Sequence, residues 1–224
     1  MSCIEIAHDR YYRISCTISF METTNTDKLA ISIYTEMTPN PETLKFVANK
    51  KLVTQSFEFT SIDDAKPSPL ATELFHLPFV KGVFIDENYI SITKYDVAEW
   101  NDITMELREF IKTYLESNKL VIADDVAAAN NSNKHNSDVE FEALDDTSKE
   151  IVNILDEYIK PAVASDGGNI IFDSYDPNTK LVKVILQGAC SGCPSSTFTL
   201  KNGIENMLKQ MLHDKVEMVE AING

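Results

Sequence analysis

Hydrophobic and polar positions follow clear periods through the last third of the chain. Apolar residues recur at helical spacing over residues 147–159, and Thr147 with Glu150 fits a capping box at the start of that helix. Pro161 should stop or kink the helix, because proline has no N–H to donate. The pattern then predicts, in chain order, strands at 169–174 and 181–187, a helix at 195–212 and a strand at 216–221. In this last helix the residues expected to face the core are Leu200, Ile204, Met207, Leu208 and Met211. This order is αββαβ, for which a three-stranded sheet with both helices on one face is the economical packing.

The preceding part of the chain, residues 29–120, has the pattern of a separate mixed α/β unit. Its predicted elements are strands at 29–34, 43–47, 56–60, 83–85 and 90–92, a short helix at 70–75 and a longer helix at 101–117. In the longer helix, the residues expected to face the sheet are Ile103, Leu107, Phe110, Ile111 and Tyr114. The fold class predicted for the whole chain is therefore α+β, or mixed α/β, with two small domains.

A polar, acidic segment separates the two patterns. Residues 121–145 are rich in Asn, Ser, Asp and Glu, and such a composition buries too little apolar surface to fold. We therefore predict a flexible linker at 121–145, which would let domains at 29–120 and 146–222 move relative to each other. Residues 1–28 show no regular pattern and are predicted to be a poorly ordered extension.

Composition and charge narrow the classes of function. The chain of 224 residues is 43% hydrophobic and 25% charged, as is usual for a globular protein. Its net charge of −15 argues against nucleic acid and anionic membranes as partners. The first twenty residues include Glu5 and Asp9 and lack an apolar run, which is untypical of a signal or transit peptide. We expect a bacterial cytoplasmic protein, with the mitochondrial matrix as the compartment if the source is eukaryotic.

Two of the four cysteines form the motif Cys190-Ser191-Gly192-Cys193-Pro194, between the last predicted strand of the hairpin and the helix that follows. This spacing lets both sulfurs face one metal ion or each other. A helix N-terminus favours the thiolate over the thiol, and the thiolate is the form that binds metals and attacks disulfides. The motif therefore indicates metal or cluster binding, or thiol–disulfide exchange.

One chain offers too few ligands for a closed metal site. Structural zinc usually takes four ligands, whereas the nearest histidines, His135 and His213, lie far from the cysteine pair in sequence. Either a second copy completes the ligand set, or the two thiols act as a redox pair. We interpret Cys3 and Cys16 as incidental thiols and His76 as a structural or surface histidine. No catalytic residues are predicted, because the N-terminal domain has neither a glycine-rich phosphate loop nor a histidine beside paired acids.

Further residues extend the cysteine motif into a family resemblance. The run from Gly188 to Thr197, with Pro161-Ala162 and Asp166-Gly167-Gly168 upstream, resembles the C-terminal domain of NifU-like proteins. The segment Thr38-Pro39-Asn40-Pro41, with Leu44-Lys45-Phe46, is similar to the N-terminal domain of the Nfu-type branch. The resemblance covers about residues 29–222, and so both domains in their order.

The resemblance implies an iron–sulfur cluster scaffold or carrier that is not an enzyme. It implies that Cys190 and Cys193 are the iron ligands, and that two chains each contribute a pair to one shared [4Fe–4S] cluster, with [2Fe–2S] as the alternative. The implied partners are a second copy, upstream assembly proteins and apo recipients, with the N-terminal domain as a contact module. The residues leave open a thiol–disulfide oxidoreductase that uses the same pair, and a zinc-bridged structural dimer.

Overall fold

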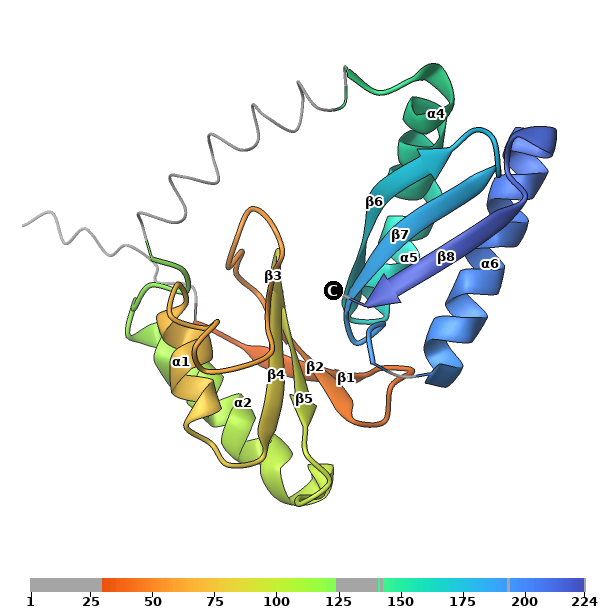
Figure 1. The fold of residues 1–224 in the computed structure, drawn as a ribbon. Helices are drawn as coiled ribbons and strands as arrows, with labels where there is room; N and C mark the ends of the chain where they lie inside the picture. Colours follow the sequence, from red (N-terminus) through yellow and green to blue (C-terminus); the bar gives the residue numbers. More distant parts are fainter. Residues whose placement is uncertain (1–29, 124–140, 142, 193, 224) are drawn as a thin grey trace, which may run out of the picture.

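The computed structural model describes residues 30–123, 141, 143–192 and 194–223, and Figure 1 shows them as two small domains that each pair a sheet with helices. The α+β class predicted from the sequence is confirmed. The predicted extension at 1–28 and most of the predicted linker lie outside the described residues. No helix within the described ranges is long and apolar enough to cross a bilayer.

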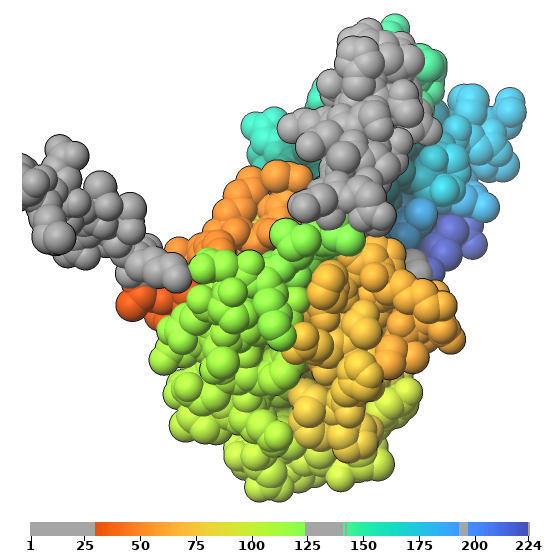
Figure 2. Space-filling view, turned by 90° about the vertical axis from the view of Figure 1, so that its left-hand side faces the viewer, coloured from red at the N-terminus to blue at the C-terminus, as the bar shows by residue number. Residues whose placement is uncertain are grey.

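The N-terminal domain is a five-stranded antiparallel sheet in the order β1-β2-β5-β4-β3. Its elements are β1 (Ile33–Met37), β2 (Thr43–Ala48), β3 (Phe57–Phe59), α1 (Pro69–Phe75), β4 (Val80–Asp86), β5 (Tyr89–Lys94) and α2 (Trp100–Glu116). Figures 1 and 2 show α1 (golden) and α2 (green) on the face of this domain turned away from the C-terminal domain. Residues 121–123 complete the packing, because Ile122 is 7% exposed in the core and the Ala123 amide donates to the Pro67 carbonyl.

Two details of this domain differ from the prediction. The first strand begins at Ile33 instead of residue 29, because pairing across the short turn before β2 sets its register from Ile33↔Ala48 to Met37↔Leu44. In α2, Phe110 is only partly buried, and its ring lies tilted beside that of Tyr114 with the centroids 6.4 Å apart. Leu115, which is absent from the predicted stripe, is 2% exposed. The other stripe residues are buried as expected.

Strand β2 is buried on both faces of the sheet, which shows that a second layer covers the side away from the helices. Leu44, Phe46 and Ala48 belong to the core under α1 and α2. Since side chains alternate along a strand, Lys45 and Val47 point to the opposite side. There Lys45 contacts the C-terminal domain, and Figure 1 shows the start of β6 and the end of β7 nearest to this sheet.

The C-terminal domain confirms the predicted αββαβ order. Its elements are α4 (Asp146–Ile154), a π-helical turn (Leu155–Ile159), α5 (Lys160–Ser165), β6 (Gly168–Asp176), β7 (Leu181–Gly188), α6 (Pro194–Leu212), a 3₁₀ turn (His213–Lys215) and β8 (Met218–Asn223). Strand β7 pairs antiparallel with β6 and parallel with β8. The helices and the inner face of the sheet share one core, in which Ile151, Val182 and Ile204 are fully buried.

The first helix of this domain begins and continues differently from the prediction. Its N-cap is Asp145 instead of Thr147: the Asp145 carboxylate accepts from the amides of Thr147 and Ser148 at 3.1 and 3.3 Å. Pro161 does not stop the helix, which runs to Ser165 after widening into the π-helical turn just before the proline. The wider turn relieves the clash between the proline ring and the carbonyl four residues earlier.

The apolar stripe of α6 divides between two environments. Ile204 and Leu208 are fully buried, as predicted, and Leu212 joins them. Leu200 and Met207 are only partly buried, and Met211 is 42% exposed, so its predicted place in the core is wrong. One edge of α6, with Leu200 and Met207, therefore faces a hollow that is described below.

The N-cap assignment can be tested with two matched substitutions. Asp145→Ala removes the acceptor for two helix amides and should lower the free energy of unfolding by about 1 kcal/mol. Thr147→Ala should change it by only a few tenths, since alanine is a good helix former. Denaturant unfolding of both variants measures this. A larger loss in Thr147→Ala than in Asp145→Ala would restore the threonine as the cap.

Candidate cysteine site

Cys190 lies in the corner where β7 ends and the chain turns towards α6. We call residues 188–192 the cysteine corner. The Cys190 side chain is 5% exposed and belongs to the core of the C-terminal domain. The corner is braced locally, because the Ser191 amide donates to the Gly188 carbonyl and the Thr197 hydroxyl donates to the Cys190 carbonyl. Cys193, the second predicted ligand, lies outside the described residues, as do Cys3 and Cys16.

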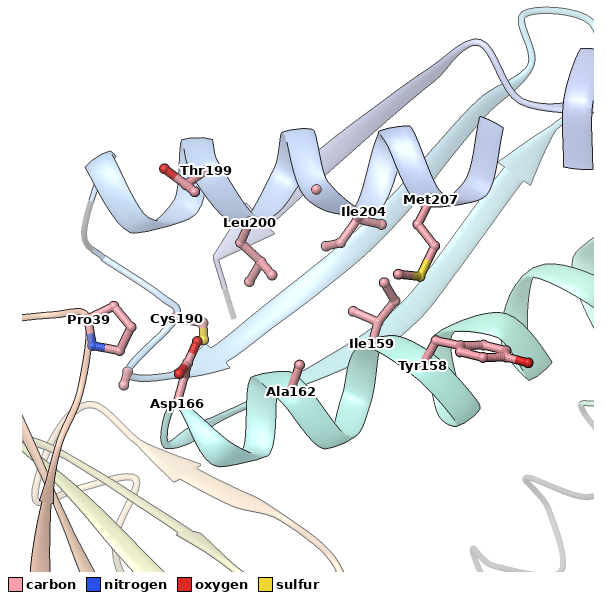
Figure 3. Close-up of a pocket in the computed structure, with 12 residues that line it drawn as sticks. Pro39, Tyr158, Ile159, Ala162, Asp166, Cys190, Thr199, Leu200, Ile204 and Met207 are labelled. Atoms are coloured by element: carbon pink, nitrogen blue, oxygen red, sulfur yellow. The ribbon is translucent and has the colours of Figure 1, made fainter. Parts of the chain in front are cut away.

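The pKa of the Cys190 thiol is shifted in the direction opposite to the sequence prediction, which favoured the thiolate. Burial raises the pKa of its thiol from 9.0 to about 12, and the nearby Asp166 carboxylate adds to the rise. Helix α6 begins only at Pro194, and the side chain is directed into the domain beside Asp166 (Figure 3), so burial outweighs the helix dipole. A metal bound at this sulfur would displace the proton, since metal binding couples to thiol ionisation.

A largely apolar groove of about 550 Å³ opens beside Cys190 (Figure 3). Leu200 and Met207 of α6 form one wall, and Ile159 and Ala162 form the other. These side chains can keep water away from a group bound at the sulfur. The groove explains why the edge of the α6 stripe is not covered by the domain's own core.

The N-terminal sheet contacts the turn that precedes β6. The Ser91 hydroxyl donates to the Gly167 carbonyl at 2.6 Å, and the Tyr89 hydroxyl donates to the Gly168 carbonyl at 2.9 Å. The Lys45 ammonium donates to the Ser165 carbonyl at 3.1 Å. The three acceptors are backbone atoms, so these contacts depend on the backbone conformation of the turn and not on its side chains.

Glu58 of β3 holds the cysteine corner itself. Its Oε1 accepts from the Gly188 amide at 2.9 Å and from the Ser191 hydroxyl at 3.3 Å. Its other oxygen, Oε2, is buried and has no hydrogen-bond partner among the described residues. Burial raises the pKa of this carboxyl, against the lowering effect of the two hydrogen bonds.

Sequence reasoning missed Glu58, although one signal was present. The residue stands between Phe57 and Phe59, and both phenylalanines pack against the N-terminal core. Strand alternation therefore places the carboxyl on the opposite face of the sheet. The alternation does not reveal that another domain covers that face.

The histidines weighed from the sequence are not brought to Cys190. His76 ends α1 and His213 follows α6, and both are exposed. His135 lies outside the described residues. Within the described ranges, no three side chains from His, Cys, Asp and Glu gather as a metal site.

Fold and site together define a two-domain α+β protein in which an N-terminal sheet abuts a cysteine corner of the second domain. The family model "Scaffold protein Nfu/NifU N terminal" matches residues 33–118, and the model "NifU-like domain" matches residues 151–219. The chain belongs to the Nfu-type family, with an N-terminal Nfu domain and a C-terminal NifU-like domain. The family resemblance stated from the sequence is thereby confirmed.

Curated relatives share both domains. The "NFU1 iron-sulfur cluster scaffold homolog, mitochondrial" of Drosophila willistoni is 38% identical over 198 residues, which cover 87% of this chain and 65% of that protein. The "NifU-like protein 4, mitochondrial" of Arabidopsis thaliana is 34% identical over 193 residues, which cover 86% of this chain and 66% of that protein. The chain thus spans about two thirds of the length of these relatives or slightly less.

Gly168 makes the position of Cys190 testable. A Cβ at Gly168 would lie 2.5 Å from the Gln187 carbonyl oxygen and 2.8 Å from the Cys190 sulfur, so Gly168→Ala should lower the free energy of unfolding by about 1 to 3 kcal/mol. Gly203→Ala is the control, since nothing lies within 4 Å of its Cβ, and in helix α6 it should stabilise by about 0.5 to 1 kcal/mol. Equal effects in denaturant unfolding would contradict this packing.

The raised pKa of Glu58 predicts a pH-dependent effect of Glu58→Gln. A carboxyl whose pKa is raised on folding favours the folded state at low pH, and that contribution is lost as the pH rises through the raised pKa. Near neutrality, Gln keeps an accepting oxygen without the buried charge and should raise Tm by about 2 °C. The gain should shrink as the pH falls towards 4.5, the ordinary glutamate value.

Thermal unfolding across this pH range measures the difference between Glu58→Gln and the parent. Glu106→Gln on the exposed side of α2 is the control and should show no such gain. A lower Tm for Glu58→Gln near neutrality would mean that the charged carboxylate holds the corner better than a neutral amide does.

Proposed function

We propose that this protein is an iron–sulfur cluster scaffold that holds a [4Fe–4S] cluster between two copies of the chain and transfers it to apo-proteins. The observation that carries the proposal is the Cys190 thiol at the edge of an apolar groove in a NifU-like domain. The names of the relatives, which call them iron–sulfur cluster scaffolds, support the same role.

The number of thiols argues for two chains. A [4Fe–4S] cluster takes four cysteine thiolates, and the motif of one chain supplies Cys190 and Cys193. Two cysteine corners would complete the set, and the apolar walls of the groove would lower the access of water to the bound cluster. A [2Fe–2S] cluster held by the same four sulfurs is the second form that this ligand set allows.

The cluster is the cargo of the protein, and its transfer is a series of ligand exchanges. At each exchange a recipient thiol binds iron and gives up its proton, and one scaffold cysteine leaves the iron and takes up a proton. Burial favours the protonated form of Cys190, which assists its departure from iron. Only bonds between iron and cysteine sulfur are exchanged, so we class the protein as a carrier instead of an enzyme.

The proposed partners follow from the same chemistry. They are a second copy of the chain, an upstream protein that assembles clusters, and apo recipients with free cysteines. The net charge of −15 does not favour binding to nucleic acid or to anionic membranes. We place the protein in the mitochondrion ahead of the bacterial cytoplasm, because both relatives carry mitochondrial names.

The hypothesis of a thiol–disulfide oxidoreductase has no support in the site or in the relatives. Thiol–disulfide exchange needs an accessible thiolate at neutral pH. The Cys190 side chain is 5% exposed, and its thiol pKa is raised to about 12. The relatives named above are scaffolds and NifU-like proteins.

Cysteine substitutions test the proposed ligands. Cys190→Ser and Cys193→Ser should each abolish cluster binding without changing the circular dichroism spectrum, because two remaining thiolates per dimer cannot hold a cluster. Anaerobic reconstitution followed by iron and sulfide assays should give about four irons per dimer in the parent and almost none in these variants.

The matched control applies the same chemical change at the other two cysteines. Cys3→Ser and Cys16→Ser together should leave the iron and sulfide content at the parental level. Normal cluster loading in the Cys190→Ser, Cys193→Ser double variant would refute the ligand assignment. Zinc in place of iron in the parent protein would favour the zinc-bridged structural dimer.

A further inference from the structure

The N-terminal sheet has one face that is built for contact with the cysteine corner. This docking face consists of Lys45, Glu58, Phe84, Tyr89 and Ser91, which come from four strands. Phe84 and Tyr89 form a small apolar cluster with Val47 that is separate from the core under the helices. Lys45 lies over the Tyr89 ring at 4.6 Å and pairs with Glu36 at 2.9 Å, which fixes its ammonium near the Ser165 carbonyl.

The docking face and the corner meet at backbone distance. Gly188 has a φ of +65°, and a Cβ there would lie 2.8 Å from the Phe84 ring. The Gly188 amide points to Glu58, and the carbonyls of Gly167 and Gly168 accept from Ser91 and Tyr89. Contact this close needs glycine at 188, so the corner is shaped for the N-terminal sheet as well as for its own turn.

This contact closes one side of the Cys190 region. Tyr89 is 4% exposed and donates to the carbonyl of Gly168, whose Cα lies against Cys190: a Cβ there would be 2.8 Å from the sulfur. Pro39, in the turn between β1 and β2, lines the groove beside Cys190 (Figure 3). A recipient thiol or a second corner therefore has access to the sulfur from fewer directions while the domains are docked.

We infer that the outer face of the N-terminal sheet is a docking site for the cysteine corner of its own chain, and that docking withholds Cys190 from incoming thiols and metal until the two domains separate. The cysteine corner and the turn before β6 occupy this face. Glu58 contacts Gly188, Tyr89 contacts Gly168 and Ser91 contacts Gly167. If docking regulates the loading of a cluster, the inference rests on the proposed function. If docking regulates only the access of thiols to Cys190, the inference does not depend on that function.

The composition of the contact suits reversible docking. Four of its hydrogen bonds join side chains to backbone atoms, and two join side chains, Ser191 to Glu58 and Asn169 to Ser56. Its apolar part includes the small cluster of Phe84, Tyr89 and Val47. Glu58 also leaves one buried oxygen without a partner, which lowers the stability of the docked form. Interfaces of this mixed kind between domains of one chain commonly open and close.

The test is alkylation of Cys190 in the full-length, metal-free protein carrying Cys193→Ser. Iodoacetamide is the probe, and the Cys190 peptide is followed by mass spectrometry so that Cys3 and Cys16 do not contribute. Glu58→Lys replaces an acceptor with a donor facing the Gly188 amide, and Ser91→Trp places a bulky ring against the Gly167 backbone. Each should raise the alkylation rate by about tenfold or more, because Glu58→Lys loses a charge-assisted hydrogen bond and Ser91→Trp replaces a hydrogen bond with a steric clash.

Two variants should alkylate no faster than the parent. Glu58→Gln keeps an oxygen that accepts from the Gly188 amide and removes the buried charge, so it should hold the corner at least as tightly as Glu58 does. Glu106→Lys makes the same charge change as Glu58→Lys on exposed α2, which lies on the other face of the sheet. Circular dichroism confirms that each variant keeps its helices.

Hydrogen exchange of the Gly188 amide reports docking separately in Ser91→Trp, where Glu58 is intact. Faster exchange together with faster alkylation supports the inference. Faster exchange with unchanged alkylation would show that docking does not protect the thiol, and no change in either would show that this face does not hold the corner. Both results overturn the inference while leaving the cluster proposal standing, because no cluster takes part in the measurement.

Discussion

The placement of the two domains depends on a hydrogen bond between them: the amide of Gly188 donates to the carboxylate of Glu58. Gly188 ends β7, and Cys190 follows two residues later, so this bond sets where the cysteine corner lies relative to the N-terminal sheet. The nearby bonds from Tyr89 and Ser91 hold the turn before β6 in the same way. Without this set of contacts, β2 would be covered on one face only.

The site is consistent with a carrier that must both protect and release its cargo. A buried thiol with a raised pKa is a poor nucleophile but a good metal ligand once its proton has been displaced. The apolar groove limits the access of water to Cys190 on one side, and the N-terminal sheet covers the cysteine corner on another. The two features limit unwanted thiol chemistry, and separation of the two domains, as inferred above, would uncover the corner.

Much of the fold could be predicted from hydrophobic periodicity, because β2, the β4–β5 hairpin and the αββαβ domain have strong local patterns. The errors arose where tertiary contacts decide. Strand pairing moved β1, Asp145 replaced Thr147 as the cap, and the π-helical turn carried the helix past Pro161. At the site, the motif predicts Cys190 and Cys193 as ligands, and both assignments stay predictions. The role of Glu58 depends on a domain contact that no local pattern contains.

The central claim is that a single chain cannot hold the cluster alone. Native mass spectrometry of anaerobically reconstituted protein tests it most directly, because it reads the number of chains and the mass of the bound cluster in one species. The account predicts that the mass of one [4Fe–4S] cluster appears on the two-chain species and that the single chain carries none. A cluster bound to a single chain, with no added thiol such as glutathione as a further ligand, would contradict it.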